Sequence, residues 1–446
     1  MVVVDPSARF SVSRTFRDGV PSIVPDGFAL WGEFRGVRST GVSGLPGSVD
    51  NVSAMRLLHT SDWHIGRTFH GHDLLEEQWR VLSEVAELVR SEGVDVVVVA
   101  GDLYDRSVPS GEAVQLCVDV LERIRKAGAR LVVTPGNHDS PQRVGAFAEF
   151  AAAGGLHLHT RTSRLHEPTV LTDEHGPVAF YGLPYLEPDP ARQVLRGTPA
   201  PGATEEDIAR GHEAVLREAM NRVRGELATR PGTRSVVLAH AFVSGAESSD
   251  SERDITVGGV DRVPAHVFEG VDYVALGHLH GPQRVSERVR YSGSPLAYSF
   301  SEARQRKSVW LVDLDEQGLG AVRRHELPVP RELATLEGEL DNLLQDRQYE
   351  PFVDCYVSAV VTDESRPLDG MRRLRRRFPY AVHMEWRPAE GRARAPLRYS
   401  EAVRGRDERR IVRDFVTNCR GTEPSESECA LLDRALDEVG ASEVRR

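Results

Sequence analysis

The stretch Arg130-Leu-Val-Val-Thr-Pro-Gly-Asn-His-Asp139 decides how the rest of this 446-residue chain is interpreted. Its apolar residues 131–133 predict a short buried strand, and the proline and glycine that follow end the strand without starting a helix. The strand is therefore followed by Asn137, His138 and Asp139, which offer an amide oxygen, an imidazole and a carboxylate. Such groups bind metal ions, and the glycine lets the turn approach a phosphate closely.

Four other expected strands end in residues of the same kind. These ends contain Asp62 and His64, then Asp102 and Asp105, then His240, and finally His278 and His280. In an open α/β sheet, ligands bind beyond the carboxyl ends of the strands. We therefore expect all five strand ends to line one pocket.

In chain order the five ends read D-x-H, G-D-x-x-D, G-N-H-D, a lone H and G-H-x-H. This order resembles the calcineurin-like metallophosphoesterases, and most closely the SbcD family, the nuclease subunit of the bacterial SbcC–SbcD complex. The resemblance includes R-D-I-x-x-G at 253–258 and G-S-P-L-A-Y-S-F at 293–300, and it covers most of residues 55–440. It implies an α/β fold, a calcineurin-like sandwich with α/β/β/α layers, followed by a small α/β capping domain and a helical C-terminal tail.

The expected domain organisation follows from this pattern. Residues 1–54 have no sustained hydrophobic period, so we expect them to be disordered. Because the resemblance begins at Met55, they could instead come from an upstream start codon. A proline-bearing link at 327–330 separates the nuclease domain from the next unit. The expected units are therefore 1–54, a nuclease domain at 55–335, a capping domain at 336–395 and a helical partner-binding tail at 396–446.

Alternating strand and helix patterns predict a largely parallel sheet with right-handed crossovers. Residues 73–90 and 112–126 carry helical apolar stripes, and 96–99 is a continuous β-branched run typical of a strand covered on both faces. After Asp139 we expect a helix to about residue 153.

Three further segments carry expectations that the structure tests. The proline- and glycine-rich segment 187–203 predicts a loop, and 308–316 predicts the last strand of the nuclease domain. The charged segment 331–345 is interpreted as helical.

Composition limits the classes of function. No apolar run approaches the roughly 18 residues of a membrane span and no signal-peptide pattern is present, so we expect a cytoplasmic protein. The net charge of -11 argues against bulk electrostatic binding of nucleic acid, although bound divalent cations would add local positive charge. No G-K-[ST] occurs, so the chain has no P-loop, and any ATP is expected to be hydrolysed by another subunit.

The family resemblance implies two divalent metal ions. A mixed set of imidazole, carboxylate and amide ligands suits manganese, with magnesium as the alternative. Transferred residue by residue, the first metal takes Asp62, His64, Asp102 and His280, and the second takes Asp102, Asn137, His240 and His278. His138 is implied to protonate the leaving oxygen or to stabilise the transition state, with Asp139 orienting it, while Asp105 supports the ligands.

Other residues allow two interpretations. Alternation of His157 and His159 with leucines favours a surface strand of an edge hairpin over a metal site. A dense basic cluster could contact DNA phosphates or be a solvated helix face; it consists of Arg372, Arg373, Arg375, Arg376 and Arg377. The tail could pack on its own domain or accept a partner helix; its candidate contact residues are Ile411, Phe415, Leu432 and Leu436.

The resemblance implies a 3′-to-5′ exonuclease on duplex DNA that also acts as an endonuclease on hairpins and single strands. Its partner would be an SbcC-like coiled-coil ATPase in DNA repair, replication and recombination, with the chain as a homodimer inside a heterotetramer. One alternative is a phosphoesterase for a small nucleotide or a phosphoprotein. Another is a mainly structural subunit that bridges DNA ends.

Overall fold

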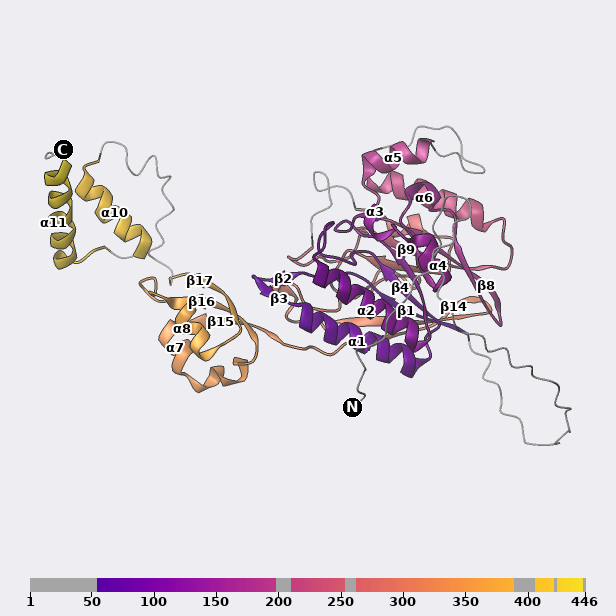
Figure 1. Cartoon of the computed structure of the whole chain (residues 1–446), viewed down its shortest axis with the longest axis horizontal. Helices are drawn as coiled ribbons and strands as arrows, with labels where there is room; N and C mark the ends of the chain where they lie inside the picture. The colour runs from indigo at the N-terminus through magenta and orange to yellow at the C-terminus, as the bar shows by residue number, and fades with distance from the viewer. Residues whose placement is uncertain (1–53, 198–209, 253–261, 389–405, 421–422, 444–446) are drawn as a thin grey trace, which may run out of the picture. The chain divides into compact units, whose positions relative to one another are not determined.

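The computed structural model describes residues 54–197, 210–252, 262–388, 406–420 and 423–443 (Figure 1). The expectations for residues 1–53 and for the R-D-I-x-x-G segment fall outside these ranges.

The first sheet has the strand order β14-β13-β1-β4-β5-β6. Its strands are β1 (Met55–Thr60), β4 (Val96–Ala100), β5 (Arg130–Thr134), β6 (Leu156–Leu158), β13 (Ser308–Asp315) and β14 (Gly318–Glu326). From β1 to β6 the neighbours are parallel, whereas β13 and β14 add antiparallel pairs. All five residues of β4 are buried, as the β-branched run predicts.

The second sheet has the strand order β11-β12-β10-β9-β8-β7. Its strands are β7 (Thr169–Asp173), β8 (Gly176–Leu183), β9 (Arg234–His240), β10 (Tyr273–Gly277), β11 (Gln283–Arg284) and β12 (Val289–Tyr291). Its four central strands are parallel, and an antiparallel strand closes each edge. The expectation of largely parallel pairing is thus met in both sheets.

The two sheets pack face to face through the side chains that alternate residues of each strand direct to the same side. Leu57 and Val98 of the first sheet belong to one buried cluster with Phe180 and Val236 of the second. The next residue along β1, Leu58, faces the other way and packs under the helices.

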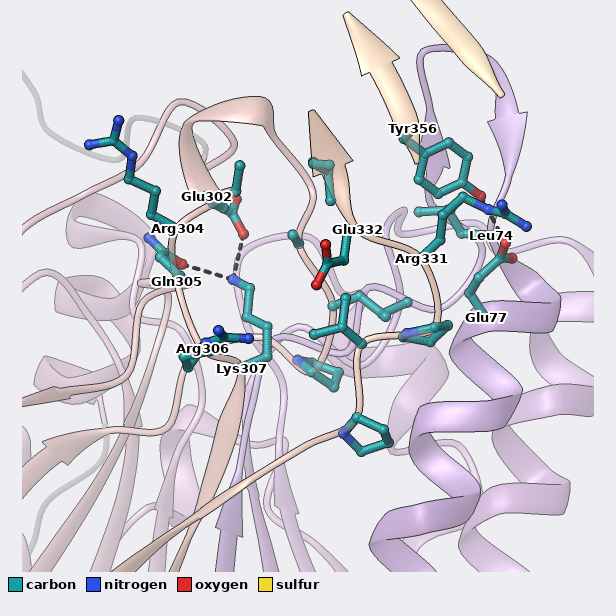
Figure 2. Close-up of a pocket in the computed structure, with 18 residues that line it drawn as sticks. Leu74, Glu77, Glu302, Arg304, Gln305, Arg306, Lys307, Arg331, Glu332 and Tyr356 are labelled. Carbon is teal, nitrogen blue, oxygen red and sulfur yellow. Dashed lines mark hydrogen bonds and ion pairs between the residues drawn. The ribbon is translucent and has the colours of Figure 1, made fainter. Parts of the chain in front are cut away.

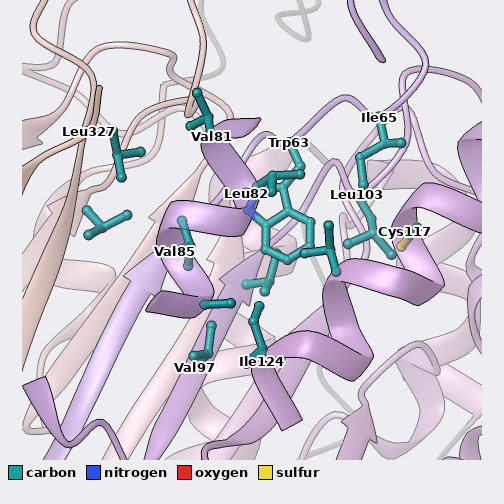
Figure 3. Packing of buried hydrophobic residues seen from close by; sticks show 14 of the residues in the cluster. Trp63, Ile65, Val81, Leu82, Val85, Val97, Leu103, Cys117, Ile124 and Leu327 are labelled. Atoms are coloured by element: carbon teal, nitrogen blue, oxygen red, sulfur yellow. The ribbon is translucent and has the colours of Figure 1, made fainter. Parts of the chain in front are cut away.

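Helices cover both outer faces. Helices α1 (Leu75–Glu92) and α2 (Gly111–Ala127) cover the first sheet, and Figure 3 shows the apolar residues beneath them. Helices α5 (Pro188–Gly197) and α6 (His212–Leu227) cover the second sheet. The predicted α/β/β/α layering is confirmed, as are the two helices expected at 73–90 and 112–126.

The prediction of a loop at 187–203 was wrong in its first half, which forms α5. Ala191 and Leu195 are four residues apart and both are buried against the second sheet, which outweighs the prolines at the start of this helix. Proline is tolerated in a first helical turn because its missing N–H has no partner there anyway. The helix expected up to residue 153 is divided into α3 (Pro141–Val144) and α4 (Ala148–Ala153), with Gly145 following α3.

The segment 308–316 is not the last strand of its sheet, because β14 pairs antiparallel with β13 across a tight turn. The helical interpretation of 331–345 was also wrong: it contains the strand β15 (Leu333–Gly338) followed by the helix α7 (Leu340–Gln345). Strand β15 crosses the domain boundary expected at 335.

A separate three-stranded sheet of order β15-β16-β17 comes next, with β16 (Tyr356–Val361) and β17 (Ala381–Trp386) parallel to their neighbours. Helices α7 and α8 (Gly370–Arg377) pack on it around a core of their own. The tail contains α10 (Glu408–Arg420) and α11 (Glu426–Glu443). Short elements complete the fold: β2 (Thr68–Phe69), β3 (His72–Asp73), η1 (Thr162–Arg164), η2 (Ala265–Phe268), η3 (Phe300–Glu302) and η4 (Arg347–Phe352).

Within the described ranges, no helix combines the length and the apolar character needed to cross a bilayer.

Candidate metal centre

The carboxyl ends of five parallel strands meet at one edge of the sandwich. Strands β1, β4 and β5 bring the first three polar turns there from the first sheet, and β9 and β10 bring the last two from the second. Gly277 makes this meeting possible, because a Cβ on it would lie 1.8 Å from the carbonyl oxygen of Ala100 in the other sheet. The turn glycine Gly136 has the same role within the first sheet, since its Cβ would lie 2.1 Å from Oδ1 of Asp102.

Four of the expected ligands have an unusual backbone conformation. Asp62, His64, Asp102 and His278 have φ values of 52°, 44°, 49° and 106°, a region that residues other than glycine rarely occupy. Such strain persists only where the surrounding structure imposes it, and it is frequent at functional sites. Backbone hydrogen bonds impose it here, from the N–H of Asp62 to Gly101 (3.1 Å) and from the N–H of His64 to Asp102 (2.9 Å).

Six side chains form three overlapping groups, and within each group the candidate ligand atoms lie within 4.8 Å of one another. The groups are Asp62, His64 and His280; His64, Asp102 and His138; and Asp62, Asp102 and His240. Because each group shares members with the others, they form one continuous cluster. All but His138 are buried.

Asp102 lies between the two halves of the cluster. Its Oδ2 is 3.5 Å from Nε2 of His64 and 3.4 Å from Nε2 of His240, and its Oδ1 accepts the backbone N–H of His138 at 2.9 Å. Although burial opposes ionisation, His240 and the other imidazoles hold the pKa of Asp102 well below its usual range. A carboxylate that stays ionised between two sets of ligands fits the bridging position.

The imidazoles face one another in a way that suits shared cations. Nε2 of His64 lies 3.1 Å from Nε2 of His280, so at least one of these nitrogens is an acceptor without a proton. Burial lowers the pKa of His64 well below its usual value, and its Nδ1 has no hydrogen-bond partner among the described residues. The donor set of carboxylates, imidazoles and an amide, without a thiolate, fits divalent cations.

The last two expected ligands lie beside this cluster. Oδ1 of Asn137 is 2.9 Å from Nε2 of His240, so it points at the candidate ligands of the second ion. The ring of His278 is 5.4 Å from that of His240, and its backbone N–H donates to Oδ1 of Asp62 at 2.9 Å. The structure thus brings all seven expected metal ligands to one edge, with Asn137 and His278 outside the three tight groups.

His138 is oriented by a different group from the one expected. Its Nδ1 donates to the backbone carbonyl of Asp105 at 2.8 Å, which leaves Nε2 for a substrate. Asp139 instead accepts the N–H groups of Leu103, Tyr104 and Gly136 at 3.0, 2.9 and 2.9 Å. Asp139 therefore ties the second and third polar turns together, and the expectation that it orients His138 was wrong.

Oδ1 of Asp105 lies 3.6 Å from Nδ1 of His64, beside the candidate ligands. His157 and His159 lie away from the cluster on and after β6, and Nε2 of His159 is 2.9 Å from Oγ1 of Thr169. The edge-strand interpretation holds, although β6 pairs parallel with β5 and is not part of a hairpin.

Sequence reasoning missed the side chains behind His280. Nδ1 of His280 contacts Ser251 and Glu302, and Glu302 forms an ion pair with Lys307. Two signals in the sequence could have found them: the match at 290–302, which ends at Glu302, and the rarity of lysine, because Lys307 is one of two in the chain.

The basic cluster on α8 is largely occupied by contacts inside its own unit. Arg372 and Arg373 pair with Asp369 and Asp341, whereas Arg375 and Arg377 donate to backbone carbonyls. In the tail, salt bridges join α10 to α11, and Phe415 remains 59% exposed. The other tail candidates, Ile411, Leu432 and Leu436, are half-buried.

Comparison with known proteins decides the family. The family model described as calcineurin-like phosphoesterase matches residues 55–282, about half of the chain. This chain belongs to the calcineurin-like phosphoesterase family. A second model, described as the type 5 capsule protein repressor C-terminal domain (SbcD_C), matches residues 329–419.

The resemblance of this phosphoesterase to SbcD is confirmed by a curated relative. The D subunit of the nuclease SbcCD from Staphylococcus epidermidis is 29% identical over 327 residues, which cover 73% of this chain and 83% of that protein. Among solved structures, TT1561 of Thermus thermophilus is 14% identical, covers 61% of this chain and 99% of its own, and has a TM-score of 0.36. A dimetal phosphatase of Danio rerio is 12% identical, covers 62% of this chain and 100% of its own, and has a TM-score of 0.34.

Proposed function

We propose that this phosphoesterase is the metal-dependent DNA nuclease subunit of an SbcC–SbcD-like complex. It removes nucleotides from duplex DNA in the 3′-to-5′ direction and cuts hairpins and single strands internally. It acts in the cytoplasm with an SbcC-like ATPase in DNA repair, replication and recombination. The observation that carries the proposal is the position of Asp102 between two sets of ligands in a chain similar to SbcD over most of its length.

The cluster can hold two divalent cations, most suitably manganese, and such ions activate water and neutralise phosphoryl oxygens. The first ion would take Asp62, His64, Asp102 and His280, and the second Asp102, Asn137, His240 and His278. His138 is the residue placed to act on the substrate. The carbonyl of Asp105 accepts a hydrogen bond from Nδ1 of His138, which leaves Nε2 facing the substrate. In the imidazolium form, Nε2 carries the second proton and would donate it to the leaving oxygen or to a phosphoryl oxygen.

The test is manganese-dependent release of nucleotides from end-labelled linear duplex DNA. Wild type and Asp102→Asn are compared, each with and without the SbcC-like partner and ATP. We expect release that requires Asp102 and increases with partner and ATP. Hydrolysis of a small chromogenic phosphodiester without release from DNA would contradict the nuclease and favour a small-molecule phosphoesterase.

We place the partner contact on the α10–α11 hairpin. Phe415 and Leu431 are 59% and 60% exposed on its two helices, which leaves apolar surface for a partner helix. Deletion of residues 401–446 is expected to abolish co-purification with the ATPase while leaving the circular dichroism melting of the remaining domains unchanged. Retained co-purification would refute this assignment.

We also propose that the chain is a homodimer within a heterotetramer. Phe147, just before α4, and Phe150, within α4, are 73% and 82% exposed, an unusual state for large apolar side chains. Changing both to serine is expected to halve the mass measured by light scattering after gel filtration. An unchanged dimer mass would place the self-contact elsewhere.

A further inference from the structure

The metal-ligand candidate His280 is held from behind by side chains distant in sequence. Its Nε2 faces His64, whereas its Nδ1 is 2.6 Å from Oγ of Ser251 and 3.3 Å from Oε1 of Glu302. Its backbone N–H donates to Oε1 of Glu252 at 2.8 Å. Imidazoles that bind metals characteristically have their second nitrogen fixed in this way, because that contact sets the tautomer and the direction of the ring.

Glu302, at the end of η3, is fully buried, and both oxygens of its carboxylate have polar partners. Oε1 accepts hydrogen bonds from the hydroxyls of Ser249 and Ser251 in addition to contacting His280. Oε2 accepts the backbone N–H of Tyr298 at 3.2 Å and pairs with the ammonium of Lys307. A buried carboxylate with an ammonium partner thus lies directly behind the candidate ligand.

Lys307 contacts both Glu302 and the backbone of His280. Its Nζ lies 2.9 Å from the backbone carbonyl of His280, 3.0 Å from Oγ of Ser294 and 2.9 Å from Oε1 of Gln305. Figure 2 shows the ammonium directed at Glu302 and Gln305, which line a cavity of about 370 Å³ together with Lys307. A compact ammonium can reach acceptors in several directions, which the planar fork of an arginine cannot do. This explains a lysine here in a chain whose basic residues are otherwise nearly all arginine.

We propose that Glu302 and Lys307 are positioning residues that fix His280, so that its Nε2 is directed at the cation shared with Asp62 and His64. Glu302 orients the ring through Nδ1, and Lys307 fixes both Glu302 and the backbone of His280. This inference rests on the metal centre of the proposed function. It assigns to the pair a specific effect on one of the two ions.

A purely structural role is the competing explanation, because removing one member of any buried ion pair destabilises a fold. The chain offers a matched control in the pair Asp173–Arg234, whose side chains are 12% and 5% exposed. Arg234 is the first residue of β9, and the candidate ligand His240 is the last. The strand between them is about 20 Å long, so the Asp173–Arg234 pair lies far from the metal centre. Loss of Asp173 therefore reports the cost of breaking a buried pair without touching a ligand.

The experiment titrates the full-length protein with Mn²⁺ by calorimetry and counts free Mn²⁺ by electron paramagnetic resonance. The variants are Glu302→Gln, Lys307→Met, the double variant and the control Asp173→Asn, with melting temperature recorded for each. We expect two ions in wild type and Asp173→Asn. Glu302→Gln is expected to bind one ion normally and the other about 10- to 100-fold more weakly, as for other residues that support a metal ligand.

The double variant separates positioning from folding. It leaves no unpaired charge in the interior, so it should melt at a higher temperature than Lys307→Met yet keep the weakened Mn²⁺ site. It also provides the comparison if Glu302→Gln does not fold. Wild-type affinity for both ions in a folded Glu302→Gln or double variant would overturn the inference, as would an equal loss in Asp173→Asn.

Failure of the proposed function gives a different result. A wild type that binds two Mn²⁺ ions but cleaves no DNA would overturn the nuclease and leave the positioning role intact. A wild type that binds no Mn²⁺ would overturn both the metal centre and this inference.

Discussion

The two halves of the metal centre are supported in different ways. The half from the first sheet is held by backbone groups of its own turns: Asp62 and His64 hydrogen-bond to the turn after β4, and Asp139 binds N–H groups of two turns. In the half from the second sheet, His280 instead contacts the side chains of Ser251 and Glu302. The first half is thus supported by groups of the five polar turns themselves, whereas His280 depends on side chains outside those turns.

This difference predicts different sensitivities. Backbone-supported turns tolerate changes of distant side chains but not changes of shape within the turn. A ligand supported by side chains loses its orientation when a distant contact is removed. Variants in each half test this contrast, and the largest effect is expected at His138.

His138 belongs to the first half but is not expected to hold either ion, so its loss should separate binding from chemistry. In His138→Gln we expect the rate of phosphodiester hydrolysis to fall by about 10²- to 10⁴-fold, the usual contribution of a general acid. Mn²⁺ binding measured by calorimetry should still show two ions. His278→Asn is the matched comparison in the second half and should lose affinity for one ion. Loss of an ion in His138→Gln would make His138 a ligand.

Gly136→Ala should damage the first half through shape alone. The new Cβ would lie 2.1 Å from Oδ1 of Asp102, so the turn or the bridging carboxylate must move. We expect a loss of about 1–3 kcal/mol in unfolding free energy, as for other overpacked sites, together with weakened Mn²⁺ binding. Gly111→Ala is the control, because nothing lies within 4 Å of a Cβ there. Equal denaturant midpoints and equal Mn²⁺ affinities for the two variants would contradict the backbone-supported picture.

The contrast also explains what the sequence could predict. The clustering of the candidate ligands could be predicted because each follows an apolar strand within a short motif, such as Asp62 and His64 after β1. Glu302 and Ser251 were not, because only the folded chain brings them to His280. The strand pattern was clear where apolar residues are continuous, as in β4, and was missed in β14, which ends in four polar residues and has only its first residue buried.

The interface between the sheets should give the fold a pH dependence of its own. His59 is fully buried there, with Nδ1 2.9 Å from the hydroxyl of Tyr273 and Nε2 3.1 Å from the carbonyl oxygen of Leu276. Burial lowers the pKa of His59 to about 3. Because the unfolded chain binds this proton below about pH 6.5 and the folded chain does not, stability is complete above that pH and falls as the pH decreases towards 3.

The measurement is urea unfolding of wild type and His59→Phe between pH 7.5 and 5 in chelator-containing buffer, which removes metal binding from both. Between pH 6.5 and 5 we expect wild type to lose about 2 kcal/mol more than His59→Phe, since one unit is worth about 1.4 kcal/mol per proton. Identical pH profiles would show that His59 is protonated or solvated in the folded state.

The smallest effect concerns DNA bound outside the metal centre. On α8, Arg372 and Arg376 are exposed, whereas Arg377 is directed at the carbonyls of Leu343 and Asp346. In a chain with a net charge of -11, two arginines on the unit built on β15–β17 could still bind phosphates locally. If they do, changing both to alanine should reduce the salt dependence of duplex binding by about two units of the logarithmic slope and weaken affinity a few-fold.

The control removes the same charge from α1 by changing Arg80 and Arg90, whose side chains are both 59% exposed. Binding is measured by fluorescence anisotropy with Ca²⁺ in place of Mn²⁺, so that the DNA stays intact during the titration. Equal salt-dependence slopes for the two double variants would show that α8 is an ordinary solvated helix face. The candidate metal centre would then be the main DNA-binding surface. A smaller salt-dependence slope for the α8 variant alone would show that α8 contacts DNA in addition to the candidate metal centre.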